Sequence, residues 1–216
     1  MVSPFSIDLA GSGRTSARRF GARGARAALV LAHGAGAPQI HPWIVAMAEA
    51  VAARGVEVMT FNFAYAEAKR RAPDRNDVLE ATWRAALEAL RPAAPARTFI
   101  GGKSMGGRIA TQVAAAGAEV AGLVLLGYPL HPPGKPGQLR AGHLPAVRAP
   151  MLFVQGSRDP FGTPAELEPI VRGLAPGTRL FVVEGGDHSF VRPKSSGGSL
   201  EGTMARVADE IARFIG

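Results

Sequence analysis

Cysteine is absent from the 216 residues of this chain, which excludes disulfide bridges, thiolate metal sites and a cysteine nucleophile. Long apolar runs are also absent, because no segment approaches the roughly 18 consecutive apolar residues that a membrane helix needs. Aromatic residues make up only 6% of the chain and charged residues only 19%. Because no membrane-length apolar run occurs, and no secretory apolar core precedes a cleavage-like site, we expect a cytoplasmic protein that has no membrane partner.

The rest of the composition is typical of a folded chain. Apolar residues account for 47%, and the 27 glycines and 17 prolines form no repeat, which excludes a collagen-like or low-complexity chain. A chain of this length can bury one sizeable core. We therefore expect a single domain over residues 1–216.

Positive charge is in excess, with 25 lysines and arginines against 17 acidic residues and a formal net charge of +8. Five of the arginines lie near the start of the chain, at Arg14, Arg18, Arg19, Arg23 and Arg26. Such a cluster can contact nucleic acid or belong to a transit peptide. It has no interleaved aromatic residue except Phe20, so we expect no nucleic-acid partner. We expect instead that the charge attracts anionic substrates or acidic partners.

Short β-like runs alternate with amphipathic helical stretches along the chain. A hairpin is expected from residues 5–9 and 15–20 around the turn at 11–13, and buried strands at 27–32, 56–63, 98–101, 122–126, 151–155 and 179–183. Helices are expected from Pro42 to Gly55, from 74–77 to just before Pro92, over 105–116, from Thr163-Pro164, and over 200–215. This alternation predicts an α/β fold, a mostly parallel sheet with helices on both faces and an antiparallel N-terminal edge.

The segment Gly102-Lys103-Ser104-Met105-Gly106 lies between an expected strand and an expected helix. Gly-x-Ser-x-Gly is typical of a nucleophile elbow, in which the serine occupies a strained turn and the glycines let strand and helix approach closely. The segment also contains Gly-Lys-Ser, but a phosphate-binding P-loop needs glycine where this chain has Arg97. An ordinary glycine turn with a surface serine is the simpler alternative. We interpret Ser104 as the candidate nucleophile.

A serine hydroxyl needs a base to take its proton and a third group to orient that base. Asp159 lies four residues beyond the expected strand 151–155, and His188 follows the last expected strand. The carboxyl ends of parallel strands meet at one edge of a sheet, so we predict that Ser104, Asp159 and His188 form a catalytic triad. Asp187 is the alternative acid, which we disfavour because adjacent side chains diverge in most loops.

The other four histidines have no spacing that marks a base or a metal site. We interpret them as structural residues or as residues at the border of a pocket, and they are His33, His41, His131 and His143. We expect neither a metal nor an organic cofactor.

Attack by Ser104 creates an oxyanion that backbone N–H groups stabilise. The residue after the nucleophile, Met105, is expected to supply one donor. The second is expected from the glycine-rich loop after the strand 27–32, where small residues allow close approach. There we predict Ala35 as the donor, with Gly34 and Gly36 as substrate-binding residues and alternative donors. A turn that only reverses the chain is the simpler alternative.

Taken together, these segments resemble the α/β-hydrolase family over essentially the whole chain. LAHGAGA resembles the oxyanion loop, GGKSMGG the elbow, QGSRDPFG the loop of the acid and GGDHSF the loop of the base. More narrowly, AHGAGA, HPW, GKSMGG and LGYPLHPPGKP are similar to a group of small bacterial hydrolases and to the hydrolase-like domain of an animal histone-acetyltransferase complex subunit. The resemblance implies a Ser-His-Asp hydrolase and implies little about its substrate.

Many lipases and dehalogenases of this fold insert a helical cap after the strand that corresponds to residues 122–126. Here only a short proline-rich loop leads to the next strand, so we expect no cap and an open site, with Tyr128 and His131 at its rim. An open site disfavours action on long-chain triglycerides and suits short acyl esters or a larger accessible acyl group. A serine nucleophile also argues against dehalogenation, which uses a carboxylate.

The leading interpretation is therefore a carboxylesterase that hydrolyses a small-molecule ester through an acyl-enzyme. A thioesterase, amidase or peptidase could use the same three residues, because a triad does not choose its leaving group. A non-catalytic scaffold protein that keeps the hydrolase fold is the alternative of a different class.

Overall fold

A computed structural model of the chain describes residues 2–11, 13–21, 25–90, 97–193, 195 and 197–216. Its strands are β1 (Val2–Leu9), β2 (Gly13–Phe20), β3 (Ala27–Ala32), β4 (Glu57–Phe61), β5 (Arg97–Lys103), β6 (Gly122–Leu126), β7 (Met151–Gly156) and β8 (Arg179–Val183). Its α-helices are α1 (Pro42–Ala52), α2 (Ala64–Glu67), α3 (Asn76–Leu90), α4 (Met105–Ala115), α5 (Pro164–Val171) and α6 (Leu200–Ile215). Ser12 of the expected turn, Arg23 of the arginine cluster and Pro92 lie outside the described residues.

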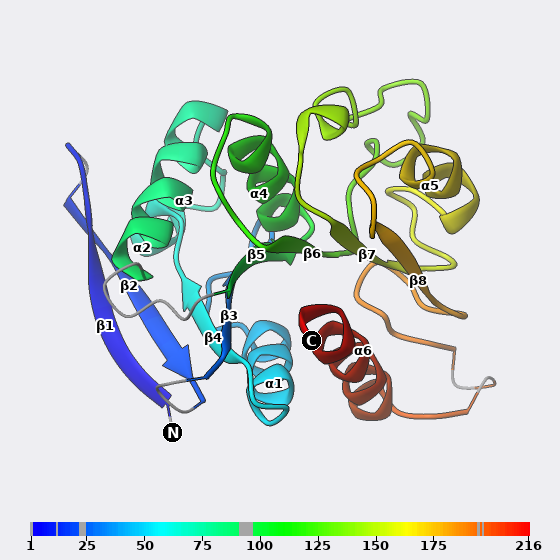
Figure 1. Ribbon diagram of the computed structural model, residues 1–216, viewed down its shortest axis with the longest axis horizontal. Coiled ribbons are helices and arrows are strands. Elements are labelled where there is room, and N and C mark those ends of the chain that lie inside the picture. Colours follow the sequence, from blue (N-terminus) through cyan, green and yellow to red (C-terminus); the bar gives the residue numbers. More distant parts are fainter. Residues whose placement is uncertain (1, 12, 22–24, 91–96, 194, 196) are drawn as a thin grey trace.

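The strands form one sheet in the order β1-β2-β4-β3-β5-β6-β7-β8 (Figure 1). β1 pairs antiparallel with β2, and β2 pairs antiparallel with β4. Every other pairing in the sheet is parallel. This arrangement confirms the predicted α/β fold with a mostly parallel sheet and an antiparallel N-terminal edge.

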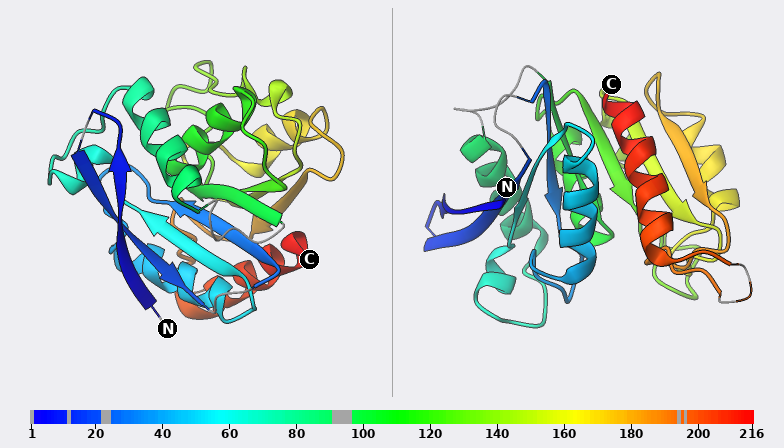
Figure 2. Two further views of the ribbon diagram at one scale, coloured as in Figure 1. Left: turned by 60° about the vertical axis from the view of Figure 1, so that its left-hand side comes forward. Right: turned by 90° about the horizontal axis from the view of Figure 1, so that it is seen from below.

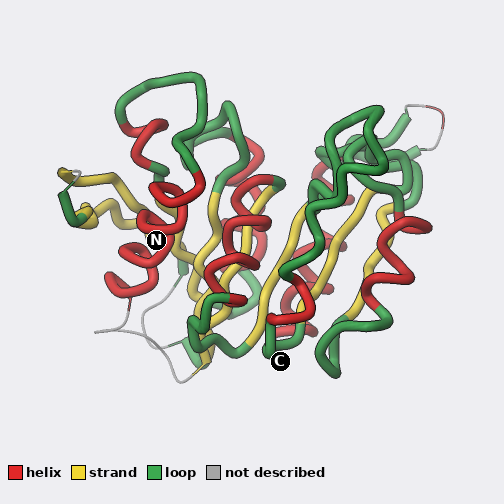
Figure 3. The backbone as a smooth tube through the Cα atoms, turned by 90° about the horizontal axis from the view of Figure 1, so that it is seen from above, coloured by secondary structure: helices red, strands yellow, loops and turns green. Residues whose placement is uncertain are grey.

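Helices cover both faces of the sheet, as the sequence predicts. α1 and α6 lie side by side on one face, and α3, α4 and α5 lie on the other (Figures 1 and 2). Figure 3 views the sheet from the side of this second group, where helices lie in front of the strands. Neighbouring residues of one strand point to opposite faces, so Val30 packs in the core under α3 and α4 while Leu29 and Leu31 pack in the core under α1 and α6.

The strand expected over residues 56–63 is shorter than predicted, because β4 ends at Phe61 and the chain turns into the short helix α2. The apolar alternation continues through Phe63, which is fully buried. Its N–H, however, donates to the ring Nε2 of His33 at 3.1 Å and not to a neighbouring strand. Because the His33 ring accepts this N–H, the hydrogen-bond ladder of β4 does not continue to Phe63. Apolar periodicity alone does not reveal that contact.

No helical cap lies between β6 and β7, because residues 127–150, all of them described, contain only the short 3-10 turn Leu144–Ala146. The predicted absence of a cap is therefore confirmed, and the carboxyl edge of the sheet above Ser104 is open. Among the described residues, no helix has the length and apolarity that crossing a bilayer requires.

Replacement of Gly101 in β5 by alanine is expected to destabilise the fold strongly. A Cβ at Gly101 would overlap the backbone carbonyl of Val124 on the neighbouring strand β6, which cannot move without disrupting the sheet. We expect the free energy of unfolding to fall by at least about 3 kcal/mol, measured by urea denaturation.

The matched control is Gly137→Ala, because a Cβ at Gly137 meets no atom within 4 Å. This variant should change the free energy of unfolding by less than about 0.5 kcal/mol. Equal stability of the two variants would contradict the close approach of β5 and β6.

Candidate active site

Ser104 lies on the sharp turn between the end of β5 and the start of α4. Its backbone dihedrals are φ 51° and ψ −117°, a conformation that residues with a side chain rarely adopt. The turn is held because the Ser104 N–H donates to Leu126 O at 2.9 Å and the Arg108 N–H donates to Ser104 O at 3.0 Å. The strained backbone directs the hydroxyl out of the sheet edge.

The glycines on either side of Ser104 are required by backbone contacts. A Cβ at Gly102 would lie 2.5 Å from Ala32 O, and a Cβ at Gly106 would lie 2.5 Å from His33 O. Real Cβ atoms do not approach carbonyl oxygens so closely. The Gly-x-Ser-x-Gly spacing therefore reflects the crossing of β5 and α4 against the end of β3, as the elbow interpretation predicts.

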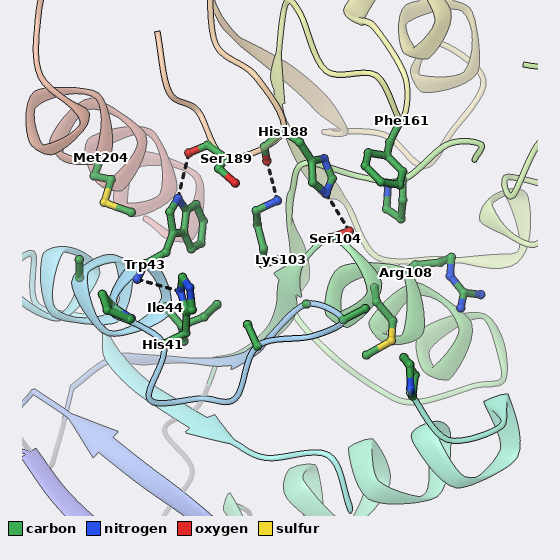
Figure 4. Close-up of a pocket in the computed structure, with 18 of the residues that line it drawn as sticks. His41, Trp43, Ile44, Lys103, Ser104, Arg108, Phe161, His188, Ser189 and Met204 are labelled. Carbon is green, nitrogen blue, oxygen red and sulfur yellow. Dashed lines mark hydrogen bonds between the residues drawn. The ribbon is translucent and has the colours of Figure 1, made fainter. Parts of the chain in front are cut away.

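The structure brings Ser104, Asp159 and His188 together from three loops. His188 Nε2 lies 2.9 Å from Ser104 Oγ, and His188 Nδ1 lies 2.7 Å from Asp159 Oδ2. Phe161 packs against the imidazole with a distance of 4.3 Å between ring centroids (Figure 4). The three side chains predicted from loop placement thus form one continuous chain of hydrogen bonds.

The surroundings of Asp159 determine which nitrogen of His188 carries the proton. Asp159 is 1% exposed, and its carboxylate also accepts the Gln155 side-chain N–H at 2.9 Å and the Phe161 N–H at 2.9 Å. Every neighbour of the carboxylate in these contacts is a donor, so His188 Nδ1 donates to it. Nε2 is then free to accept the proton of the Ser104 hydroxyl.

Asp187, the alternative acid, is engaged elsewhere. Its Oδ1 accepts the backbone N–H groups of Ser189 at 2.7 Å and of Val191 at 3.0 Å. These bonds shape the turn that carries His188 and direct the carboxylate away from the imidazole. The structure therefore places Asp159, and not Asp187, against His188.

Two side chains that the sequence reasoning missed hold the His188 loop from the opposite side. Lys103 Nζ donates to His188 O at 2.5 Å, and Trp43 Nε1 donates to Ser189 O at 2.9 Å (Figure 4). The ammonium group of Lys103 also lies 5.7 Å from the centre of the Trp43 ring. No sequence motif indicates these contacts, although Lys103 and Trp43 both lie in segments that the resemblance singled out.

Lys103 is a buried cation next to Ser104 in the chain, and only 8% of its surface is exposed. Burial lowers the pKa of Lys103 to about 8, and the carboxylates of Asp159 and Asp187 oppose this shift. The lysine is therefore poorly solvated and depends on the His188 carbonyl for its hydrogen bond.

The glycine-rich loop after β3 lies directly beside Ser104. A Cβ at Gly34 would lie 3.6 Å from the Ser104 Cβ, and Gly34, Ala35 and Met105 all line the cavity that contains the Ser104 hydroxyl. The predicted donors Ala35 and Met105 are thus located on the two backbone segments that border the serine.

His33 fixes the conformation of this loop. Its Nδ1–H donates to Gly34 O at 2.8 Å, while its Nε2 accepts the Phe63 N–H. The Tyr65 hydroxyl lies 3.4 Å from the same Gly34 carbonyl. Burial lowers the pKa of His33 to about 4, so this ring stays neutral near pH 7. The interpretation of His33 as a structural histidine is confirmed.

A cavity of about 1330 Å³ opens at this edge of the sheet, and Ser104 and His188 are in its lining. On one side it extends between α1, along residues 42–50, and residues 200–205 of α6. We call this side the apolar arm, which is lined by Trp43, Ala46, Ala50, Leu200, Met204 and Ala205. On the other side it is lined by the first turns of α3 and α4 and by the loop after β6. We call this side the cationic end, because it contains Arg108 and Arg140.

Three predicted substrate-contacting residues do not line this cavity. Tyr128 is 1% exposed, its hydroxyl donates to Arg140 O at 2.7 Å, and burial raises its pKa to about 12. His131 is 5% exposed and its Nε2 lies 3.2 Å from Glu166. The rim prediction is wrong for both, because the loop after β6 turns these rings inward. Gly36 forms a turn with φ +76° and lies outside the lining.

Of the remaining histidines, His41 lines the cavity and its Nδ1 accepts the Trp43 N–H at 3.2 Å. His143 lies 2.7 Å from the Thr111 hydroxyl. In the part of the chain that the structure describes, no three histidine, cysteine, aspartate or glutamate side chains form a group that could hold a metal ion.

A nucleophile elbow at the central strand, followed in the chain by an aspartate and then a histidine at the same sheet edge, defines the class of α/β hydrolases. Comparison with known families agrees, since residues 25–216 match the family described as alpha/beta hydrolase domain. The chain belongs to the alpha/beta hydrolase family.

Solved structures share the fold at low sequence identity. A dienelactone hydrolase from Anabaena variabilis is 21% identical with a TM-score of 0.79, over 99% of this chain and 96% of that chain. An esterase from Pyrococcus furiosus is 16% identical with a TM-score of 0.78, over 100% of this chain and 92% of that chain. A serine hydrolase without a lid from Xanthomonas campestris is 18% identical with a TM-score of 0.72, over 97% and 94%.

The buried lysine gives a pH-dependent prediction for stability. Its pKa is about 8 in the folded chain and 10.5 ordinarily, so between these values the unfolded chain holds a proton that the folded chain has released. Raising the pH through this window therefore stabilises the folded state. The free energy of unfolding of the protein, minus that of Lys103→Met, should rise from pH 8 to 10.5.

Chemical denaturation at a series of pH values measures this difference. Titrating groups that both proteins share contribute equally to the two free energies of unfolding, so their contributions cancel in the difference. Lys135→Met is the matched control, because Lys135 is exposed. The free energy of unfolding of the protein, minus that of Lys135→Met, should not change with pH. A flat profile for Lys103→Met as well would show that Lys103 is not the buried cation described above.

Proposed function

We propose that this chain is a serine carboxylesterase with Ser104 as its nucleophile, His188 as its general base and Asp159 as the group that orients the base. The observation that carries the proposal is the hydrogen-bonded series Ser104–His188–Asp159, with distances of 2.9 and 2.7 Å, at the wall of an open cavity. Membership of the alpha/beta hydrolase family is consistent with it.

In the acylation step, Ser104 Oγ attacks the ester carbonyl carbon while His188 Nε2 takes the hydroxyl proton. Asp159 keeps the Nδ1 proton of His188 in place and stabilises the imidazolium, without becoming protonated itself. The tetrahedral intermediate then collapses, the bond to the alcohol oxygen breaks, and His188 Nε2 gives its proton to the departing alcohol. An acyl group remains on Ser104.

The negative charge of the tetrahedral intermediate needs preorganised donors. We propose the backbone N–H groups of Met105 and Ala35, one on each side of Ser104. Both residues line the cavity, and His33 holds the Gly34 carbonyl so that the loop keeps its shape. Met105 is also at the N-terminus of α4, where the helix dipole favours negative charge.

In the deacylation step, a water molecule takes the place of the alcohol. His188 Nε2 removes a proton from the water while its oxygen attacks the acyl carbon, forming a second tetrahedral intermediate. The bond from the acyl carbon to Ser104 Oγ then breaks, His188 Nε2 returns the proton to Ser104 Oγ, and the carboxylic acid leaves. The protein's own side chains handle every proton. We further propose that residues 1–216 carry out this reaction as one domain in the cytoplasm without a cofactor.

The cavity favours a substrate with an extended acyl or alcohol group over a minimal acetyl ester. Its volume of about 1330 Å³ exceeds the usual range for sites that bind drug-sized ligands, which is about 300–1,000 Å³. Because no cap covers the cavity, a larger molecule can enter it without any lid having to open. A thioester or an amide could react through the same residues, and a panel of leaving groups distinguishes these reactions.

Ser104→Ala is expected to abolish hydrolysis of p-nitrophenyl acetate and covalent labelling by a fluorophosphonate. Loss of the nucleophile should lower kcat by at least about 10⁴-fold. Ser6→Ala, at an exposed position on β1, is the control and should retain both signals. Labelling that persists in Ser104→Ala would remove Ser104 as the nucleophile, and an unlabelled wild-type chain would favour the scaffold alternative.

A comparison of Asp159→Asn with Asp187→Asn tests the choice of acid. Asparagine at 159 can donate to His188 Nδ1 and so stabilises the wrong tautomer, which should lower kcat about 10⁴-fold. Asparagine at 187 keeps an oxygen for the Ser189 and Val191 N–H groups, so kcat should stay within about tenfold of wild type. Steady-state kinetics with p-nitrophenyl butyrate measures both, and a reversed order would assign the acid to Asp187.

A further inference from the structure

Two guanidinium groups line the same end of the cavity. Arg108 lies on α4 one turn after Ser104, and Arg140 lies in the loop between β6 and β7. Figure 4 shows Arg108 on the opposite side of Ser104 from Trp43. The reacting hydroxyl therefore lies between the cationic end and the apolar arm.

Neither arginine has a carboxylate partner within the described ranges of the chain. Among the residues that the structure describes, the half-buried Arg108 makes one side-chain hydrogen bond, to the side-chain oxygen of Asn76 at 3.4 Å, and the guanidinium of Arg140 makes no ion pair. The Arg140 backbone carbonyl accepts from the Tyr128 hydroxyl. Burial, and then the charge of Arg140, lower the pKa of Arg108. Two neighbouring cations without a counter-ion repel each other, and an anion between them would relieve that repulsion.

Asp74 also lines the cavity and the charge of Glu80 acts on Arg108, but both carboxylates are engaged by other groups. Asp74 accepts from Arg70 at 2.5 Å and from the Tyr65 N–H at 2.9 Å. Glu80 accepts from Asn76 at 3.2 Å and lies 3.8 Å from Arg84. The charge of Glu80 acts favourably on Arg108 but does not reach it as an ion pair. The positive charge of the cationic end thus remains available to a ligand.

The opposite end of the cavity has the opposite character. The apolar arm is lined by alanines, Trp43 and Met204, and it carries two exposed carboxylates, Glu49 and Glu201. The ammonium group of Lys103 lies against Trp43, but it donates to the His188 carbonyl. A negatively charged group is attracted to Arg108 and Arg140 and repelled from this far end. A substrate with one anionic end and one apolar end therefore has a single favoured orientation across Ser104.

We propose that Arg108 and Arg140 form a carboxylate-binding subsite, so that the preferred substrates are esters carrying a free carboxylate, such as half-esters of dicarboxylic acids. This inference rests on the proposed esterase function and names its substrate class. A guanidinium matches a carboxylate with two parallel hydrogen bonds. Positions i and i+4 of a helix lie about 5–6 Å apart at Cβ, so a carboxylate a few carbons from the ester carbonyl can reach Arg108 while the carbonyl lies at Ser104.

Equilibrium binding tests the subsite without relying on catalysis. In Ser104→Ala protein, titration calorimetry compares monoethyl adipate with diethyl adipate, which differ in one carboxylate. The half-ester should bind about tenfold or more tightly, and added salt should weaken this preference. Arg140→Gln, at an exposed position, should remove the preference, and Arg108→Gln should do the same. Arg148→Gln, an exposed arginine outside the cavity, is the matched control and should keep it.

The same variants in protein with Ser104 intact separate this proposal from the proposed function. For Arg140→Gln, the KM of monoethyl adipate should rise about tenfold, far more than the KM of diethyl adipate. If the Ser104 protein hydrolyses neither ester while the Ser104→Ala protein prefers the half-ester, the subsite stands and the esterase function fails. If the Ser104→Ala protein shows no preference, or if Arg140→Gln keeps it, the carboxylate subsite is wrong.

Discussion

Where β5 leads into α4, the chain passes so close to neighbouring backbone that no side chain fits at four glycine positions, two in β5 and two in α4. Gly101 faces the carbonyl of Val124, Gly102 and Gly106 face carbonyls at the end of β3, and Gly107 faces Gly102. This crowding forces the reversal into α4 within one residue and leaves Ser104 at a positive φ. The direction of the hydroxyl, the glycine-rich loop beside it and the start of α4 all depend on this contact between backbones.

The position of His188 depends on groups from distant parts of the chain. Asp159 and Phe161 hold the ring from the loop after β7, while Lys103 and Trp43 donate to two consecutive backbone carbonyls, those of His188 and Ser189. Contacts from four other side chains of the chain therefore fix the position of the imidazole. Since Trp43 also lines the apolar arm, the same side chain links the shape of the pocket to the placement of the imidazole.

Most of the fold and the meeting of Ser104, Asp159 and His188 could be predicted because their signals are local. Continuous apolar runs mark the strands, glycine spacing marks the elbow, and the order of serine, aspartate and histidine follows from which strand each residue succeeds. The end of β4 could not be predicted, because His33, thirty positions earlier, takes the N–H of Phe63. The contacts of Lys103 and Trp43 with the His188 loop could not be predicted either, for the same reason.

The error at Tyr128 and His131 has a related cause. A loop rich in proline indicates a stiff connection, but its composition does not state which of its side chains turn toward the core. Arg140, in the same loop, faces the cavity, while the Tyr128 ring packs inside against Phe153. Only the packing of the loop on β7 decides between these outcomes.

The open edge above Ser104 has a consequence for the fate of the acyl-enzyme in the proposed mechanism. With no cap between β6 and β7, bulk solvent reaches the acyl carbon directly, and so does any dissolved alcohol or amine. The acceptor is then selected by concentration and intrinsic nucleophilicity, not by a closed chamber. Reactants exchange freely at such a site, but the site does not select which acceptor receives the acyl group. In the proposed mechanism, transesterification therefore competes with hydrolysis wherever alcohols are abundant.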